Sequence, residues 1–284
     1  MMLADTHTLH VSEKYRIIDF RCKCVVCSLS EPEYNNSFAI TFIKSGYFEY
    51  RVFRNNLEAH TGKVLVSKPG FEHSTFHINN QPDTSTTFEF RADFVEELKA
   101  MYPQTSDWFL KNNDIHSIIL RCTPEMDYLH HAVLKSLLSG TSTRLQIDEW
   151  VMELVDELMC GLAKISKDDR LPDSLRKYHL PTVENAKDFM LKHFHENISL
   201  QQVADHCLVS PFHFSRIFKT ASGLSPHQYL TGIRLNHAKN LLTTTNLSVG
   251  EISFESGFNS IEHFATAYRQ RFGMSPSEFR KQIV

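Results

Sequence analysis

The sequence predicts an α+β protein: an N-terminal antiparallel β-barrel, a helical segment, and a C-terminal all-α domain. Stretches that alternate apolar and polar residues continue to about residue 90, and apolar residues recur at helical spacing after that point. A segment of the C-terminal third is also repeated within the chain. The expected organisation is a first domain at 1–165, a linker at 166–181 and a second domain at 182–284.

Bulk composition limits the class of protein. With 284 residues, 42% hydrophobic and 22% charged, the chain is long enough for two domains that each bury a core. No stretch approaches the roughly 18 apolar residues of a membrane span. The N-terminus "MMLADTHTLHVSEKYR" lacks the basic and apolar regions of a secretory signal. We therefore expect a cytoplasmic protein with no membrane partner, in which thiols stay reduced.

The strands of the barrel are expected at about 14–90. "FAITFIKSGYFEYRVF" alternates apolar and polar residues on both sides of Ser45-Gly46, which predicts a hairpin there. The turn signals "RNN", "HTGK" and "KPGFEH" follow at intervals of about ten residues. This spacing is typical of an antiparallel barrel or sandwich.

Helices are expected at about 91–165. "ADFVEELKAMY" and "EMDYLHHAVLKSLLSG" have helical patterns, and Gly140 should end the second. Between Arg144 and Ile165, apolar residues recur at steps of three and four, which predicts a helix with one apolar stripe. The stripe has two alternative roles: packing on the chain's own barrel, or pairing with a second copy. "SKDDRLPDSLRKYHLP", polar and with two prolines, is the expected linker.

The repeat predicts two helix-turn-helix units. "SPFHFSRIFKTASGLSPHQYL" (210–230) aligns without a gap to "SIEHFATAYRQRFGMSPSEFR" (260–280). Upstream, "ISLQQVADHC" aligns to "LSVGEISFES", and the second copy has one extra residue in the turn between its two aligned blocks. Each copy opens with a capping box, Ser then Gln or Glu three residues later, and ends its second helix at a glycine. A short helix, a tight turn and a capped helix with an aromatic inner side make a helix-turn-helix. The alternative is an all-α bundle with two similar hairpins.

Charge is unevenly distributed. Residues 181–284 carry 10 Lys+Arg and 8 Asp+Glu, a net +2, whereas the first 180 residues carry 20 and 25, a net −5. A weakly positive C-terminal segment permits DNA binding with modest non-specific affinity. Such a chain would bind weakly as a monomer, so we expect a homodimer on paired sites, with the 144–165 helix as its means.

The exposed second helix of each unit is expected to enter a major groove. Arg216 offers the guanidinium fork that matches guanine, a pairing worth about 1–3 kcal/mol of discrimination, and Phe212 suits a thymine methyl. The second unit is poor in donors, so the first should supply most base readout. The predicted DNA-binding residues are Ser210, Pro211, Phe212, His213, Ser215, Arg216, Lys219, Asn259, Ser260, Ile261, Glu262, Ala265, Thr266 and Arg269, with Arg271 as a further backbone anchor.

Residues 182–284 resemble the DNA-binding domain of the AraC/XylS family of bacterial transcription regulators. "AKNLL", "EISFESGFNSIEHFATAYRQRFGMSPSEFR" and "SPFHFSRIFKTASGLSPHQYL" carry the resemblance, and Ser253 departs from it where the family usually has Ala. It implies seven helices, the long one through "HQYLTGIRLNHAKNLLTT", and transcription activation through contact with RNA polymerase. "HTGKVLVSKPGFEHSTF" resembles a cupin-like barrel, which implies a domain for sensing a small-molecule effector or for dimerisation. Regulation without an effector is the alternative.

The cluster "RCKCVVC" holds Cys22, Cys24 and Cys27. On a strand, the first two project to one side, and with Cys122 the cluster would supply the four thiolates of a structural zinc site. Three interpretations remain open: inert packing of reduced thiols, a zinc site, or a redox sensor. The alternative ligands are His60, His73 and His77.

We expect no enzymatic activity. The sequence has no Gly-rich phosphate loop and no evident Ser/His/Asp grouping. The enzymatic alternative is the adaptive-response repair proteins, which join AraC-type helices to a zinc-held cysteine that accepts methyl groups from DNA. Their four-cysteine spacing and Pro-Cys-His motif are missing from this sequence.

Overall fold

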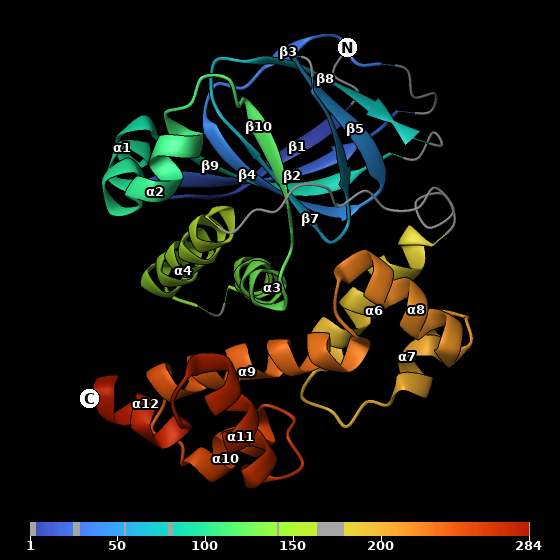
Figure 1. Cartoon of the computed structure of the whole chain (residues 1–284), viewed down its shortest axis with the longest axis vertical. Helices are drawn as coiled ribbons and strands as arrows, with labels where there is room; N and C mark the ends of the chain where they lie inside the picture. The colour runs from blue at the N-terminus through green and yellow to red at the C-terminus, as the bar shows by residue number, and fades with distance from the viewer. Residues whose placement is uncertain are drawn as a thin grey trace. The chain divides into compact units, whose positions relative to one another are not determined.

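Strands dominate the first part of the computed structural model, and helices the last (Figure 1). The structure describes residues 4–24, 29–53, 55–78, 82–140, 142–163 and 179–283. It divides into two compact units. The N-terminal unit combines Met1–Cys122 with Ala132–Glu184, and the C-terminal unit combines Thr123–His131 with Asn185–Val284.

The N-terminal unit contains two antiparallel sheets. The first has the order β1 (Ala4–Val11), β2 (Tyr15–Cys22), β9 (Thr84–Phe90), β4 (Phe38–Ser45), β7 (Lys63–Ser67), β10 (Ser117–Arg121). The second has the order β3 (Glu33–Tyr34), β8 (Glu72–His77), β5 (Tyr47–Val52), β6 (Asn55–His60). One buried cluster joins residues of both sheets: Ile43, Phe48, Tyr50, Val52, Ala59 and Leu65. The prediction of a strand-rich first part is confirmed, and the strands β1 and β10 extend it beyond the predicted range.

The predicted hairpin at Ser45-Gly46 is wrong. Strand β4 pairs with β7 and β9, whereas β5 pairs with β6 and β8, so the chain passes from one sheet to the other at this point. Gly46 has φ 90°, and a Cβ on it would lie 2.7 Å from the Cα of Asp83. Alternation with a period of two is the same on both sides of such a crossing as in a hairpin, because it reports the side of a strand and not its partner.

The middle segment contains α1 (Ala92–Met101), α2 (Pro103–Thr105), a π-helical turn (Ser106–Leu110), α3 (Pro124–Ser139) and α4 (Arg144–Leu162). The three helices predicted for it are present as α1, α3 and α4, and the strand β10 and two shorter helical turns that were not predicted lie between α1 and α3. The apolar stripe of α4 is buried within its own chain: Ile147, Val151, Leu154, Val155, Leu158 and Leu162. The Thr105 hydroxyl also donates to the carbonyl of Met159 on α4, at 3.1 Å. Of the two roles considered for the stripe, packing within the chain is therefore the one observed.

The predicted linker lies largely outside the described residues, at 166–178, and its last two residues already belong to α6 (Leu180–His193). Six further helices follow: α7 (Leu200–His206), α8 (Pro211–Ser222), α9 (Pro226–Thr244), α10 (Val249–Glu255), α11 (Ile261–Phe272) and α12 (Pro276–Ile283). Residues 179–283 thus contain the seven helices that the resemblance implied.

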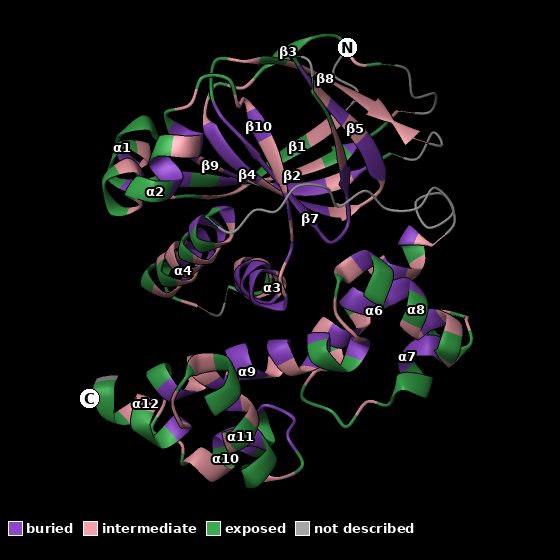
Figure 2. Cartoon of the chain, viewed as in Figure 1, coloured by how far each residue is buried: buried purple, intermediate pink, exposed green. Residues whose placement is uncertain are grey.

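Helix α9 connects the two halves of the C-terminal unit. Buried residues recur along its length (Figure 2), from Tyr229 and Ile233 near its start to Ala238 and Leu242 near its end. It packs against α8 as well as against α10, α11 and α12. Among the helices of the described residues, none combines the length and apolar character needed to cross a lipid bilayer.

Candidate nucleic-acid interface

Helices α7 and α8 form the first helix-turn-helix unit. The Ser199 hydroxyl accepts from the amide of Gln202, whose side chain accepts from the Ser199 amide at 2.7 Å, so the predicted capping box is present. Ser210 caps α8 by accepting from the amide of His213 at 3.4 Å. Pro211 occupies the first helical position, where a missing N–H costs nothing. The start of α8 is therefore determined by local interactions.

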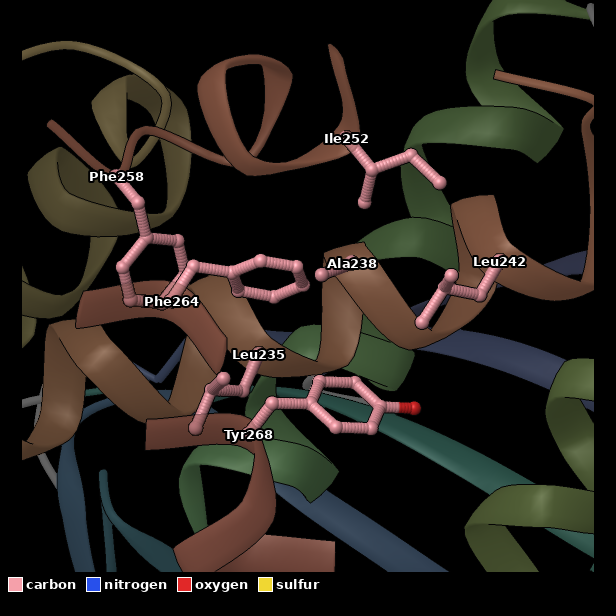
Figure 3. Packing of buried hydrophobic residues seen from close by; sticks show 7 residues of the cluster. All are labelled: Leu235, Ala238, Leu242, Ile252, Phe258, Phe264 and Tyr268. Carbon is pink, nitrogen blue, oxygen red and sulfur yellow. The ribbon is translucent and has the colours of Figure 1, made fainter. Parts of the chain in front are cut away.

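Helices α10 and α11 form the second unit in the same way. Ser248 and Glu251 make a capping box, and the hydrogen bonds from Ser248 lower the pKa of the Glu251 carboxyl. Ser260 caps α11 by accepting from the amide of His263 at 3.1 Å. The inner side of this unit packs on α9 in one cluster (Figure 3): Leu235, Ala238, Leu242, Ile252, Phe258, Phe264 and Tyr268.

The turns differ in the residue that adopts a left-handed conformation. In the second unit it is Gly257, with φ 81°, and a Cβ there would lie 2.4 Å from the carbonyl oxygen of Phe194. In the first unit it is Leu208, with φ 57° and a side chain 91% exposed. The turn of the second unit is one residue longer, as the alignment of the two copies predicted.

The outer side of α8 presents cations and an aromatic ring. Phe214 and Phe218 face the core, whereas Phe212 is 81% exposed and Arg216 and Lys219 are exposed. The side chains of Arg216 and Lys219 form no ion pair with the residues that the structure describes. Pro211, His213 and Ser215 are half-buried, and Ser210 is exposed. One guanidinium group and one ammonium group are thus available to an external anion.

The outer side of α11 is less basic. Ile261, Glu262 and Thr266 are exposed, and Ala265 is half-buried. Before the helix, Ser260 is half-buried, and the exposed Asn259 amide donates to the Asn197 side chain at 3.4 Å. None of the predicted DNA-binding residues is buried in either unit. Their exposure is compatible with the predicted interface.

Both arginines of α11 are held in ion pairs. The Arg269 Nη2 lies 3.1 Å from the Glu278 Oε2 on α12, and Arg271 Nε lies 2.9 Å from the Oε1 of buried Glu125 on α3. Hydrogen bonds from Ser275, with a smaller contribution from Arg269, lower the pKa of the Glu278 carboxyl to about 2. Both arginines therefore form ion pairs with carboxylates of the same chain. The sequence pattern, which predicted that they lie on the outer side of the helix, did not indicate these pairs.

Arg234 on α9 is a supporting residue that the sequence did not indicate. Its Nε donates to the carbonyl of Phe194 and its Nη2 to the carbonyl of Glu196, each at 2.7 Å. Burial lowers the pKa of its guanidinium group. These bonds fix the segment that follows α6, and Gly257 packs on the same segment. A lone arginine in a long helix carries no sequence signal for such a role.

The candidate metal ligands are brought together only in part. Cys22 and Cys24 lie with His77 in one group, whereas Cys122, buried after β10, is not part of it; Cys27 lies outside the described residues. The other two candidate histidines are not part of this group: the His60 ring hydrogen-bonds the Thr61 carbonyl at 2.6 Å, and the His73 ring stacks on Tyr50.

Comparisons with known proteins include a family match within the C-terminal segment and a relative that aligns along most of the chain. Residues 203–282 match the family described as "Helix-turn-helix domain". The HTH-type transcriptional activator RhaS of Escherichia coli O1:K1 / APEC is 25% identical over 259 residues, which cover 88% of this chain and 87% of RhaS. A transcriptional regulator with an AraC-type DNA-binding domain, from Chromobacterium violaceum, has a crystal structure 34% identical to this chain, with a TM-score of 0.35, covering 37% of this chain and 93% of that one.

A further relative combines two activities. The bifunctional transcriptional activator/DNA repair enzyme AdaA of Bacillus subtilis (strain 168) is 30% identical over 113 residues, or 40% of this chain. The match covers 51% of AdaA, so the chain spans about half the length of that relative. The similarity to AdaA is therefore partial for both proteins.

Proposed function

The chain belongs to the AraC/XylS family of helix-turn-helix regulators, and we propose that it is a sequence-specific DNA-binding transcription regulator. The observation that carries the proposal is the outer side of α8, where Arg216 and Lys219 are exposed beside Phe212 on a helix whose opposite side is buried. Base edges and phosphates are the partners that suit such a surface.

The two units take different parts in this proposal. Arg216 makes the principal base contact, through the bidentate geometry that guanine O6 and N7 accept. Thr266 occupies the equivalent position of α11 and cannot supply that fork. The capped starts of α8 at Ser210 and of α11 at Ser260 are the positive ends of the helix dipoles, where a phosphate is favoured. The first unit therefore reads sequence, and the second adds apolar and backbone contacts.

The N-terminal unit supplies regulation in this proposal. Its two packed sheets support a cupin-like barrel, which would sense a small molecule or mediate dimerisation. A homodimer on paired sites, about 34 Å apart or a multiple of it, suits the weak net charge of the C-terminal segment. Because the α4 stripe is buried within the chain, a dimer would use another surface. RhaS is named a transcriptional activator, which favours activation and contact with RNA polymerase for this chain too.

The test begins with selection of binding sites from random duplex DNA by the full-length protein. On the selected site, Arg216→Ala should weaken binding by about ten- to a hundredfold and relax sequence preference at one base pair. The matched variant Thr266→Ala should change affinity by less than about threefold. Both residues are exposed, so circular dichroism and the melting temperature should stay those of the parent chain. No enriched sequence, or equal losses for the two variants, would refute the assignment.

A further inference from the structure

Two cysteines and a histidine converge at one end of the N-terminal unit. Cys22 is the last residue of β2, Cys24 lies two residues further on, and His77 is the last residue of β8. One ligand atom from each residue, two sulfurs and a ring nitrogen, lies within 4.8 Å of the other two. Because β2 and β8 belong to different sheets, the group connects the two sheets.

The distance between Cys24 and His77 matches that of two ligands on one metal ion. In a tetrahedral zinc site with Zn–S of about 2.3 Å and Zn–N of about 2.1 Å, a sulfur and a nitrogen ligand lie about 3.6 Å apart. The Sγ of Cys24 lies 3.6 Å from Nδ1 of His77. Two sulfurs on the same ion would be about 3.8 Å apart. The three ligand atoms lie within 4.8 Å of one another, so the two sulfurs would move together by no more than about 1 Å to share one ion.

The histidine is oriented as a metal ligand requires. Its Nε2 hydrogen-bonds the Oδ1 of Asp83 at 2.6 Å, and Asp83 is 3% exposed. A carboxylate at this nitrogen holds the proton there, which leaves the lone pair of Nδ1 directed at Cys24. The second nitrogen of a metal-binding histidine almost always donates to a carboxylate, a backbone carbonyl or water, which fixes both the tautomer and the ring orientation, and Asp83 is such an acceptor.

The surrounding backbone holds the group in place. The Cys22 amide donates to the Asp83 carbonyl at 2.9 Å, which extends the pairing of β2 with β9 by one step. The Sγ of Cys22 accepts from the amide of Cys24 at 3.4 Å. Gly46 lies against the backbone of Asp83 so closely that a Cβ would overlap it. The carboxylate and the cysteines are thus positioned by the sheet rather than by loops alone.

We propose that Cys22, Cys24 and His77 bind a thiophilic divalent cation of the Zn²⁺ class when the chain is reduced, and that oxidation of Cys24 abolishes the site. Two thiolates and one imidazole select zinc over calcium or magnesium, which prefer oxygen ligands. The site lies in the N-terminal unit and goes beyond DNA binding. Inert packing does not account for a histidine oriented by a buried carboxylate beside two sulfurs.

Reduction is part of the proposal, because Cys24 is disulfide-bonded in this structure. A dithiol reductant supplies two electrons and two protons: the disulfide of Cys24 becomes two thiols, and the dithiol becomes its own disulfide. Binding of the cation then displaces the thiol protons of Cys22 and Cys24 to solvent. Cys24 is half-buried, so a small dithiol can approach it.

The first experiment uses cobalt as a spectroscopic substitute for zinc. The full-length protein is reduced with dithiothreitol, freed of the reductant under argon and titrated with Co²⁺. We expect one Co²⁺ per chain, with the intense visible bands of tetrahedral cobalt and a near-ultraviolet thiolate-to-cobalt band, both removed by an equivalent of Zn²⁺. The oxidised chain should show neither band. A weak octahedral spectrum, or the same spectrum in the oxidised chain, would overturn the proposal.

Variants then assign the ligands. Cys24→Ser and His77→Ala should each weaken Co²⁺ binding at least tenfold, and Asp83→Asn about tenfold through loss of the orienting carboxylate. The matched control is Cys160→Ser, on the exposed side of α4, which should bind like the parent chain. If Cys24→Ser binds cobalt as tightly as the parent, Cys24 is not a ligand and the assignment fails.

A labelling measurement does not depend on the folding of any variant. In the reduced parent chain, Zn²⁺ should slow alkylation of Cys22 and Cys24 at least tenfold by peptide mass spectrometry, with Cys160 as the internal reference. Equal alkylation rates with and without Zn²⁺ would contradict the site.

Discussion

Helices α8 and α11 begin and end alike, and yet they present different chemistry. Each starts at a serine whose hydroxyl accepts from the third helical amide, and each ends at a glycine with φ 79°. Their outer sides diverge: α8 carries Arg216 and Lys219, whereas α11 carries Thr266 and Arg269 at the same two positions. The repeat therefore preserves the residues that form the local structure and varies those on the outer sides of the two helices.

The following helices explain part of the difference. Gln228 and Glu278 occupy equivalent positions in the capping boxes that start α9 and α12. The carboxylate of Glu278 also holds Arg269, whereas the neutral Gln228 offers no charge to Lys219. Similarly, Arg271 on α11 reaches Glu125, where the first unit has the buried Ala221. The second unit uses its cations within the protein, whereas Arg216 and Lys219 of the first unit form no ion pair with the residues that the structure describes.

The largest expected effect is a loss of stability on substitution of the glycine in the turn of the second helix-turn-helix unit, where the first unit has Leu208. Gly257→Ala should lower the free energy of unfolding by about 3 kcal/mol, because the new Cβ would lie 2.4 Å from the Phe194 carbonyl oxygen on a backbone with φ 81°. Chemical denaturation of the full chain measures this loss. DNA affinity should fall with it, since the turn positions α11.

Gly273→Ala is the matched control, because Gly273 has φ 79° and a Cβ added to it would have nothing within 4 Å. It should cost only the left-handed strain, about 1 kcal/mol. Equal losses in the two variants would show that backbone strain alone, and not the contact with Phe194, makes Gly257 necessary.

The second effect concerns the arginine that α11 uses internally. Arg271→Ala should destabilise the chain by about 1–2 kcal/mol, since it leaves the 5% exposed Glu125 carboxylate without its cation. The value stays low because the Arg271 side chain is 43% exposed, so solvent screens the pair. Thermal unfolding at neutral pH measures it.

The control removes the negative charge of Glu125, which Arg271→Ala leaves without its cation. In Arg271→Ala/Glu125→Gln, about half of the lost stability should return, because a neutral amide is less costly to bury than an unpaired carboxylate. Arg269→Ala, which breaks an exposed pair, should cost less than about 0.5 kcal/mol. If Arg269→Ala costs as much as Arg271→Ala, the burial of Glu125 does not determine the difference.

Local features of the C-terminal unit could be predicted from the sequence because each has a short-range cause. Ser248 with Glu251 is a capping box within four residues, and Gly223 ends α8 because a left-handed residue there satisfies the last carbonyls. The same holds for the strand-rich and helical segments of the N-terminal unit. Because the same capping residues occur in both copies of the repeat, each prediction for the C-terminal unit rests on two matching segments.

Contacts between residues far apart in the chain could not be predicted from the sequence pattern. The hairpin at Ser45-Gly46 was wrong because alternation determines which side of a strand is buried and not which strand it pairs with. His77 was one of three histidines considered as ligands, and only the packing of the two sheets, which the sequence does not show, brings it to Cys24. The partner of Arg271 lies on α3, more than a hundred residues away, where no periodicity connects them.

A reciprocal exchange tests the role of charge beside the recognition helices. Glu278→Gln should release Arg269 and raise non-specific DNA affinity a few-fold, with a salt slope steeper by about 0.9. Gln228→Glu should place a carboxylate near Lys219 and produce the opposite changes. Both substitutions keep a residue that completes the capping box, so stability should change little. Fluorescence anisotropy at several salt concentrations measures the DNA affinity and its salt dependence for both variants. Identical salt slopes in the two variants would show that the residue at this position does not control the neighbouring cation.

The smallest effect returns to the turn of the first unit. Leu208 holds φ 57° with a side chain 91% exposed, so the protein bears left-handed strain there without burying the side chain in return. Leu208→Gly removes that strain but adds freedom to the unfolded chain, and the two terms should leave a gain of no more than about 1 kcal/mol. Chemical denaturation shows whether the free energy of unfolding rises or falls in this variant, and its DNA affinity shows whether the exposed leucine contributes to binding. If stability rises while affinity for the selected site falls, the exposed leucine contributes to the DNA interface, and the strain is retained for function. If stability rises and affinity is unchanged, the two turns differ only in what packs against them, and the contrast between the units rests on α8 and α11 alone.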